Sequence, residues 1–238
     1  VGGTHACAAS IPATGSTRDI AATRAHFMAI PADPHTGEWH TTSWFNDPIY
    51  LGRYPREGLK AWRQWLPRIT DADMRTISQD LDFCGLNIYH SHQVKAGPHG
   101  PQPIPWEENR VMTMMNWPVT PEALYWGPRF MHQRYHKPIY IFESGMAASD
   151  VVSADGRVHD ANRIAYHQQY LRALARAGID GVPIRGYFIW SIIDVMEWSD
   201  GFKTRFGLVH VDRKTLRRTP KDSYAWYRGV IKTYGRMI

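Results

Sequence analysis

The chain has 238 residues, enough for one large hydrophobic core or two small ones. Hydrophobic residues make up 43% and charged residues 21%, which is typical of a soluble globular protein, and no apolar run approaches the roughly 18 residues of a membrane span. The formal net charge is +6, but the basic residues are scattered and no nucleic-acid-binding motif accompanies them. We therefore expect neither nucleic acid nor a membrane as partner.

Apolar runs alternate with helical patterns, and the helix ends carry recognisable signals. Ser16 is placed to cap a helix, Thr70 or Asp71 to begin another, and Gly178 to end a long amphipathic one. In chain order we expect a strand at 1–9, a helix at 17–28, a surface loop at 31–40, a helix at 70–78, a strand at 83–89, a polar loop from 91 to about 116, a helix at 121–135, a strand at 139–142, a helix at 160–177, a strand at 184–190, a hairpin arm at 206–211 and a helix at 223–234.

This repeated strand–helix order predicts right-handed parallel units. The uninterrupted apolar runs PIYIF and RGYFIW favour a sheet that is buried on both faces. In such folds the functional residues follow the carboxyl ends of the strands. Asn87, Tyr89, Glu143 and Trp190 occupy that position, so they are candidates for a site.

Two cysteines, Cys7 and Cys84, lie in strand-like apolar runs. That placement favours small buried thiols over a disulfide or a metal pair, and it fits a reducing compartment such as the cytoplasm. The histidines form no ligand triad and no Gly-rich phosphate loop is present, so we expect no metal and no other cofactor. The opening stretch VGGTHACAAS shows no signal-peptide pattern and favours a chain that begins within a larger fold.

Aromatic residues are abundant, with ten Trp and twelve Tyr, and they gather after the apolar runs. The stretch GYFIWSIIDVMEWSDGF places Asp194 and Glu197 between Trp190 and Trp198. Flat apolar rings beside carboxylates suit a sugar, although tryptophans more often fill cores. The plainer alternatives are an ion pair or helix cap for Glu143, an exposed loop acid for Glu197 and a turn cap for Asp194.

Several long segments resemble the family-1 glycoside hydrolases, the β-glucosidase family. In chain order, which is also the order of the family, they are SWFNDPIYLGRYP, DFCGLNIYH, NWPVTPEALY, PIYIFESG, WSIIDVMEWSDGFKTRFGLVHVD and TPKDSYAWY. The resemblance implies an α/β fold, namely strands 5–8 of a (β/α)8 TIM barrel with their helices. Residues 1–238 then form the C-terminal half of that barrel. The family's Asn-Glu-Pro motif, which carries the acid/base glutamate, belongs to the other half and does not occur here.

The resemblance assigns catalytic roles to two residues. Glu143 matches the nucleophile of a retaining hydrolase, and Tyr89 matches the tyrosine that hydrogen-bonds it. Asn87 matches the polar residue at the same strand end, which contacts the substrate. The acid/base must then come from a complementary N-terminal half-barrel chain, which is the expected protein partner.

The remaining assignments concern substrate binding. Trp190 matches the floor under the glycone, while Glu197 and Trp198 match the pair that binds its distal hydroxyls. Phe206 lines the same pocket and Trp117 matches the aglycone platform. Because members that act on 6-phospho-sugars use a different set in place of Glu197 and Trp198, the resemblance implies a non-phosphorylated glycone.

Departures from the family pattern adjoin the site, at Ile88, Phe142, Ser144, Val195 and Met196. The expected function is a retaining β-glycosidase, most simply a β-glucosidase, that acts only when the N-terminal half is present. The alternative is an inactive half-barrel that binds sugars or associates with itself. Retention of both Glu143 and Tyr89 favours the enzyme, since a sugar-binding module has no use for a nucleophile.

Overall fold

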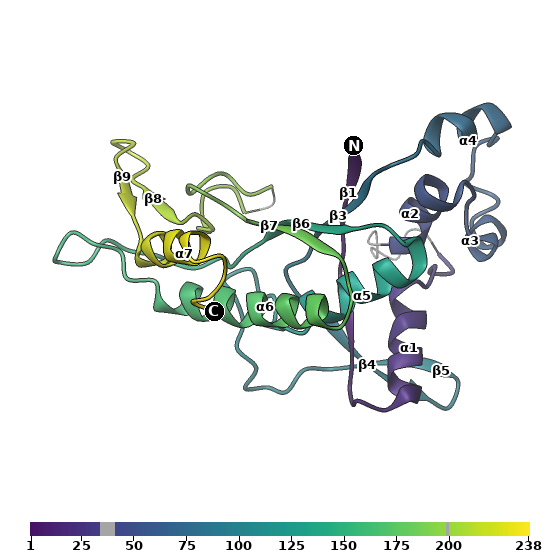
Figure 1. The fold of residues 1–238 in the computed structure, drawn as a ribbon, viewed down its shortest axis with the longest axis horizontal. Coiled ribbons are helices and arrows are strands. Elements are labelled where there is room, and N and C mark those ends of the chain that lie inside the picture. The colour runs from purple at the N-terminus through teal and green to yellow at the C-terminus, as the bar shows by residue number, and fades with distance from the viewer. Residues whose placement is uncertain (34–40, 199) are drawn as a thin grey trace.

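A parallel sheet of four strands forms the centre of the protein, whose computed structural model describes residues 1–33, 41–198 and 200–238 (Figure 1). Its strands are β1 (Gly2–Ala6), β3 (Phe83–Asn87), β6 (Ile139–Ser144) and β7 (Ile184–Ile189), and they lie side by side in chain order. All three pairings are parallel. A doubly wound sheet reverses its strand order at one point, whereas each connection here advances in the same direction, as in a β/α barrel.

Two expectations for the strands are wrong. The predicted strand at 1–9 is split into β1 and β2 (Ala9–Pro12), and β2 belongs to a second sheet. Most of the predicted polar loop at 91–116 is an antiparallel hairpin of β4 (Ser91–Gly97) and β5 (Gly100–Ile104). β4 also pairs in parallel with β2, which lies some eighty residues earlier in the chain. These long-range hydrogen bonds stabilise a strand that the polar sequence of β4 does not predict.

Five helices confirm the predicted ones: α1 (Thr17–Phe27), α4 (Asp71–Ile77), α5 (Ala123–Tyr135), α6 (Ala161–Ile179) and α7 (Asp222–Lys232). The Ser16 hydroxyl accepts from the Asp19 N–H, and Thr70 forms a capping box with Asp73. The predicted hairpin arm is β8 (Val209–Val211), which pairs with β9 (Arg218–Pro220). The predicted loop at 31–40 lies mostly outside the described residues.

Two short helices were not expected, α2 (Thr42–Leu51) and α3 (Arg56–Ala61). Pro48 and Gly58, which lie inside them, are residues that normally argue against a helix. α2 persists because its buried side chains pack in the tertiary structure, with Tyr50 placed against the ring of Tyr135 in α5. No helix among the described residues has the length and apolarity needed to cross a membrane.

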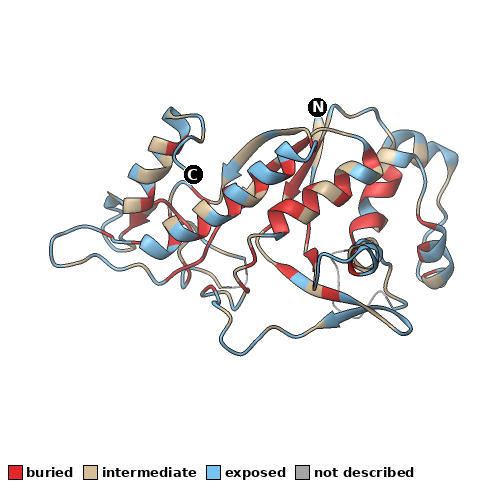
Figure 2. Cartoon of the chain, turned by 60° about the horizontal axis from the view of Figure 1, so that its bottom comes forward, coloured by how far each residue is buried: buried red, intermediate tan, exposed pale blue. Residues whose placement is uncertain are grey.

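The hydrophobic core lies between the parallel sheet and α5 and α6, which run along one of its faces (Figures 1 and 2). Leu86, Ile139 and Ile141 point into this core and are fully buried. The buried residues of α6 recur at helical spacing, as expected of an amphipathic helix, and include Tyr166 and Tyr170. Cys7 and Cys84 are both free thiols and both buried, as predicted.

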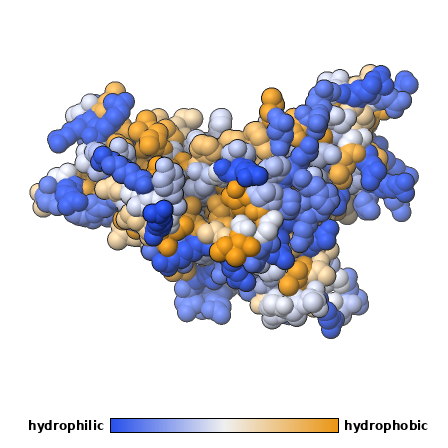
Figure 3. Space-filling view, viewed as in Figure 1, coloured by the Kyte–Doolittle hydropathy of each residue, from blue (hydrophilic) through white to orange (hydrophobic). Residues whose placement is uncertain are grey.

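The other face of the sheet carries a row of aromatic rings on β3, β6 and β7. Phe142 stacks on Phe188 with ring centroids 5.5 Å apart, and Tyr140 packs against Phe83 at 4.8 Å. Gly85 makes room for this row, since a Cβ there would meet the Phe142 ring at 2.4 Å. Phe188 is nevertheless 51% exposed, and hydrophobic patches reach the surface over the middle of the molecule (Figure 3). The described residues thus bury one face of the sheet and leave the other partly open.

One buried titratable group makes the stability of this fold depend on pH. His167 of α6 has no exposed surface, and its Nδ1 lies 3.0 Å from the Tyr187 hydroxyl. Burial, reinforced by nearby Arg163, lowers the pKa of His167 to about 3. As the pH falls below about 6.5, His167 is protonated in the unfolded chain but stays neutral in the folded chain. Acid therefore favours unfolding.

We predict that the free energy of unfolding falls between pH 6.5 and about 3 with a contribution from His167 of up to about 1.4 kcal/mol per pH unit. Urea unfolding across this range should show a shallower slope for His167→Gln. His159 is the matched control, because the hydrogen bonds that its ring donates to Asp222 and Asp155 raise its pKa. His159 thus adds stability at low pH that is lost as the pH rises, and His159→Gln should steepen the decline towards acid. Equal slopes for wild type and His167→Gln would contradict the prediction.

Candidate active site

A cavity of about 640 Å³ opens beyond the carboxyl ends of the parallel strands. The structure brings all eight residues that the sequence singled out into its lining. They are Asn87, Tyr89, Trp117, Glu143, Trp190, Glu197, Trp198 and Phe206. Among them Asn87 ends β3, Glu143 lies at the end of β6, and Trp190 directly follows β7.

Glu143 and Tyr89 are joined by a hydrogen bond. The Tyr89 hydroxyl donates to Glu143 Oε2 at 2.7 Å. Burial, together with the neighbouring Glu143 carboxylate, raises the pKa of Tyr89, so the phenol keeps its proton and remains a donor at any physiological pH. The backbone strengthens the link, because the Ile88 N–H donates to the Glu143 carbonyl at 2.9 Å. The arrangement presents an oriented carboxylate to the cavity.

The orientation of Glu143 depends on an irregularity in β6. Strict alternation would place Glu143 with Ile139 and Ile141 on the helix side of the sheet. The register with β7 shifts between Ile141 and Ser144, and it is Ser144 that becomes fully buried while Glu143 lines the cavity. Such irregularities redirect side chains at functional edges of sheets.

Asn87 offers a polar atom that nothing else in the described structure uses. Its Oδ1 is buried and has no hydrogen-bond partner among the described residues. Buried amide oxygens are rarely left unpaired, because each loses its bonds to water without compensation. A hydroxyl donor in the cavity would satisfy this oxygen.

Glu197 is held by the indole of Trp190, whose Nε1–H donates to Glu197 Oε1 at 2.9 Å. The Glu197 backbone is held as well, since Glu197 and Gly201 exchange two N–H···O bonds of 2.7 Å. Burial raises the pKa of Glu197; the Trp190 hydrogen bond opposes the shift and the Glu143 carboxylate adds to it. Trp198 touches the cavity but is 96% exposed, so the described residues leave most of this ring uncovered.

Aromatic rings form one wall of the cavity. Tyr89, Trp117 and Phe206 contact one another with ring centroids 5.2–6.2 Å apart. His90 packs on Trp117 at 5.2 Å and extends the wall. This surface suits the C–H faces of a flat or chair-shaped ligand, while Glu143, Glu197 and Asn87 supply the polar contacts.

Several lining residues were missed from the sequence. They are Ala6, Cys7, Ala8, His90 and Met115. Ala6 ends β1 and residues 7 and 8 follow it, so the strand-end rule that found Asn87 and Glu143 applies to them as well. His90 adjoins Tyr89 in the sequence, but Met115 carries no signal of its own. Among the described residues no cluster of three or more His, Cys, Asp or Glu is arranged to hold a metal ion.

The fold and this cavity define an α/β protein built as part of a β/α barrel, with carboxylates and indoles gathered at the carboxyl edge of its sheet. The chain belongs to glycosyl hydrolase family 1, whose profile matches residues 3–236. This confirms the resemblance seen in the sequence.

Relatives and solved structures agree with this membership. The chain is 45% identical over 193 residues to a 1,4-beta-D-glucan glucohydrolase of Thermotoga neapolitana, which covers 80% of the chain and 44% of that protein. It is 35% identical over 224 residues to a beta-glucosidase of an Agrobacterium species, covering 92% of the chain and 46% of that protein. The structure of the Thermotoga maritima beta-glucosidase in complex with glucoimidazole superimposes with a TM-score of 0.81 at 37% identity, covering 98% of this chain and 51% of that one. The chain therefore spans about half the length of the proteins it matches.

The raised pKa of Glu197 gives a stability prediction. A carboxyl whose folded pKa lies above its unfolded value favours folding in its protonated form, so its contribution worsens as the pH rises. Glu197→Gln keeps the shape and the Trp190 hydrogen bond but removes the charge. We expect this variant to be more stable than wild type in urea at pH 7, and equally stable near pH 4.

Glu107→Gln is the control, because Glu107 is exposed and lies outside the cavity lining. It should change the midpoint of unfolding at neither pH. A Glu197→Gln variant less stable than wild type at pH 7 would show that ionised Glu197 stabilises the fold.

Proposed function

We propose that this chain is the C-terminal half of a retaining β-glycosidase, most simply a β-glucosidase, which hydrolyses terminal non-phosphorylated β-D-glycosides. The hydrogen bond from Tyr89 to Glu143 carries this proposal. This bond orients the Glu143 carboxylate towards a cavity walled by aromatic rings, so that it can act as a nucleophile on a ligand bound there. Family membership and half-length matches to glucan-hydrolysing and glucoside-hydrolysing proteins support the same activity.

In the proposed reaction Glu143 attacks the anomeric carbon of the bound sugar. A bond forms between a Glu143 oxygen and that carbon, and the bond to the leaving oxygen breaks as a second carboxylic acid protonates that oxygen. Water, deprotonated by the same group, then releases the sugar with retention. The two carboxyl groups of such enzymes stand about 5–5.5 Å apart.

Glu197, Trp190 and Asn87 bind the non-reacting part of the sugar in this proposal. Glu197 accepts from its hydroxyls, Trp190 lies beneath its apolar face, and the unpaired Asn87 oxygen accepts one further hydroxyl. Phe206, Trp117 and Trp198 complete the walls, with Trp117 on the side of the leaving group. A carboxylate at Glu197 disfavours a phosphorylated sugar, because two negative charges would repel.

The acid/base group is assigned to the N-terminal half of the barrel. Of the two carboxylates that line the cavity among the described residues, Glu143 serves as nucleophile and Glu197 is tied to the Trp190 indole. The partly open aromatic face of the sheet supports a complementary half-barrel as partner, because such a half would cover Phe188 and pair with both edges of the sheet.

A half-barrel that associates with itself, or binds sugars without hydrolysis, is the second candidate, and the 51% exposure of Phe188 favours it. A second copy would cover the same aromatic face. The experiment below separates the two, since only the first candidate gives a covalent intermediate on Glu143.

The first prediction here is covalent labelling of Glu143. The chain is refolded together with the part of the Thermotoga neapolitana relative that it does not match, and 2,4-dinitrophenyl 2-deoxy-2-fluoro-β-glucoside is added. The good leaving group reduces the need for the acid, and the fluorine slows release of the intermediate, so peptide mass spectrometry should find the fluoroglucosyl group on Glu143. The 238-residue chain alone should hydrolyse cellobiose at a negligible rate, because its leaving group is an unactivated alcohol whose protonation requires the missing acid.

Glu143→Gln should abolish both labelling and turnover while leaving glucose binding intact. Glu57→Gln, in α3, is the matched control and should label as wild type does. Labelling of any other residue, or turnover by Glu143→Gln at the wild-type rate, would refute the assignment of the nucleophile.

The second prediction concerns the sugar-binding role of Glu197. Glu197→Ala removes charge-assisted hydrogen bonds worth about 1.5–3 kcal/mol each, which corresponds to roughly 10–150-fold. In the refolded pair we expect kcat/KM for 4-nitrophenyl β-glucoside to fall by at least that factor, with the circular dichroism spectrum unchanged. An unaltered kcat/KM would identify Glu197 as an ordinary loop acid.

A further inference from the structure

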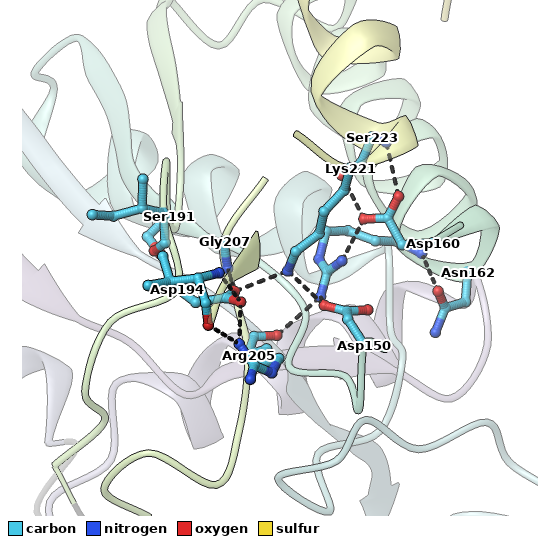
Figure 4. Close-up of polar contacts among 12 residues, drawn as sticks. Asp150, Asp160, Asn162, Ser191, Asp194, Arg205, Gly207, Lys221 and Ser223 are labelled. Carbon is cyan, nitrogen blue, oxygen red and sulfur yellow. Dashed lines mark hydrogen bonds and ion pairs between the residues drawn. The ribbon is translucent and has the colours of Figure 1, made fainter. Parts of the chain in front are cut away.

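A network of buried charges includes a residue of the loop that carries Trp190 and Glu197, and the proposed reaction does not use it (Figure 4). It contains three aspartates and three cations, so its formal charges balance. Its members are Asp150, Asp160, Asp194, Arg163, Arg205 and Lys221. Arg163, Asp160, Asp194 and Lys221 are each at most 3% exposed.

Asp194 lies between Trp190 and Glu197 in the sequence. Its Oδ1 accepts from Lys221 Nζ at 2.8 Å and from the Gly207 N–H at 3.0 Å. Its Oδ2 accepts from Arg205 at 2.7 Å and from the Val211 N–H at 3.3 Å. This carboxylate therefore fixes the loop after β7 to the segment that follows Phe206. The plainer alternative of a turn cap does not fully describe Asp194, since its carboxylate joins two separate segments.

The approach of these segments is unusually close at Gly207. A Cβ added there would lie 2.3 Å from the Asp194 backbone nitrogen and 2.8 Å from its carboxylate. Only glycine allows Phe206, the preceding residue, to stand beside the loop and line the cavity. The contact between Asp194 and Gly207 thus helps to fix two cavity-lining segments, the loop that carries Trp190 and Glu197 and the segment that carries Phe206.

Lys221 connects Asp194 to the rest of the network. It occupies the position just before α7, and its Nζ donates to Asp150 Oδ2 at 2.6 Å as well as to Asp194. Arg163 of α6 donates to the same Asp150 oxygen at 2.7 Å and to the Arg205 carbonyl at 2.9 Å. The loop after β7 is in this way attached to the N-terminal ends of both α6 and α7.

At the far end, Asp160 holds the starts of these two helices together. Its carboxylate forms an ion pair with Arg163 and accepts from the Ser223 N–H at 2.8 Å and from the Ser223 hydroxyl at 2.5 Å. Each charge of the network thus has a partner of opposite sign, which is the condition under which buried charges are tolerated. Removing one partner leaves the other uncompensated.

We propose that the Asp194–Lys221 pair is the positioning element of the sugar subsite, holding the loop so that the Trp190 indole and the Glu197 carboxylate keep their mutual geometry. The pair touches no substrate and acts only through these two side chains. The functional part of this inference rests on the proposed glycosidase activity, whereas its structural part, the fixed Trp190–Glu197 hydrogen bond, does not.

The test follows the Trp190 indole N–H, which reports directly on its bond to Glu197. Its nuclear magnetic resonance signal is assigned by its loss in Trp190→Phe, and its hydrogen-exchange rate is measured in the full 238-residue chain. Asp194→Asn and Lys221→Met should each raise that rate at least tenfold. In the refolded pair both should lower kcat/KM for 4-nitrophenyl β-glucoside at least tenfold.

Asp47→Asn is the matched control for general destabilisation. Asp47 is 3% exposed and accepts from Arg134 Nε at 2.7 Å and from the Tyr135 hydroxyl at 2.8 Å, but it joins α2 to α5 and does not line the cavity. It should lower the midpoint of thermal unfolding while leaving the Trp190 exchange rate and kcat/KM unchanged.

The double variant Asp194→Asn/Lys221→Met keeps the test decisive if a single variant fails to fold. It removes both charges of the pair, so thermal stability should recover relative to the single variants, while rapid indole exchange and low kcat/KM should persist. Recovery of wild-type exchange and kcat/KM in the double variant would overturn the proposal, because the pair would then serve stability alone. An inactive wild-type pair would refute the proposed glycosidase, and the exchange rates would still decide whether Asp194 and Lys221 position Trp190.

Discussion

Parallel pairing in chain order is the constraint on which the rest of the structure depends. Because β1, β3, β6 and β7 all point the same way, their carboxyl ends share one edge, and residues far apart in the sequence meet there. Backbone hydrogen bonds between the strands bring Asn87, Glu143 and Trp190 to that edge. Side-chain hydrogen bonds then orient the Glu143 carboxylate and the Trp190 indole.

The two faces of the same sheet differ in how far they are covered. One face buries Leu86, Ile139 and Ile141 under α5 and α6, which gives the described residues a continuous core. The opposite face carries aromatic rings of the size that fill a barrel interior, and they remain partly exposed. Function and association are coupled in our proposal for this reason, since the surface that needs a partner adjoins the edge that bears the cavity.

The buried polar groups of the charge network and of the cavity differ in whether their hydrogen-bonding capacity is filled. Asp194 and Asp160 are saturated by cations and backbone N–H groups, as suits residues that hold segments in place. The Asn87 Oδ1 instead lies buried without a partner among the described residues. A ligand gains most from an oxygen of the second kind, because the protein has already removed it from water.

The sequence by itself determined the alternation of strands and helices, the caps at Ser16 and Thr70, and the family, because apolar periodicity and long ordered motifs are local properties of the chain. It also named eight of the residues that line the cavity, since the strand-end rule and the family motifs both depend on position along the chain. Tertiary structure alone decided the rest. The hairpin of β4 and β5 forms where β2 supplies a neighbour, and α2 forms despite Pro48 because packing outweighs propensity. The shifted register of β6 directs Glu143 into the cavity. The ion pairs among Asp150, Arg163 and Lys221 form only in the folded chain, because they join residues up to 71 positions apart and no periodic pattern in the sequence indicates them.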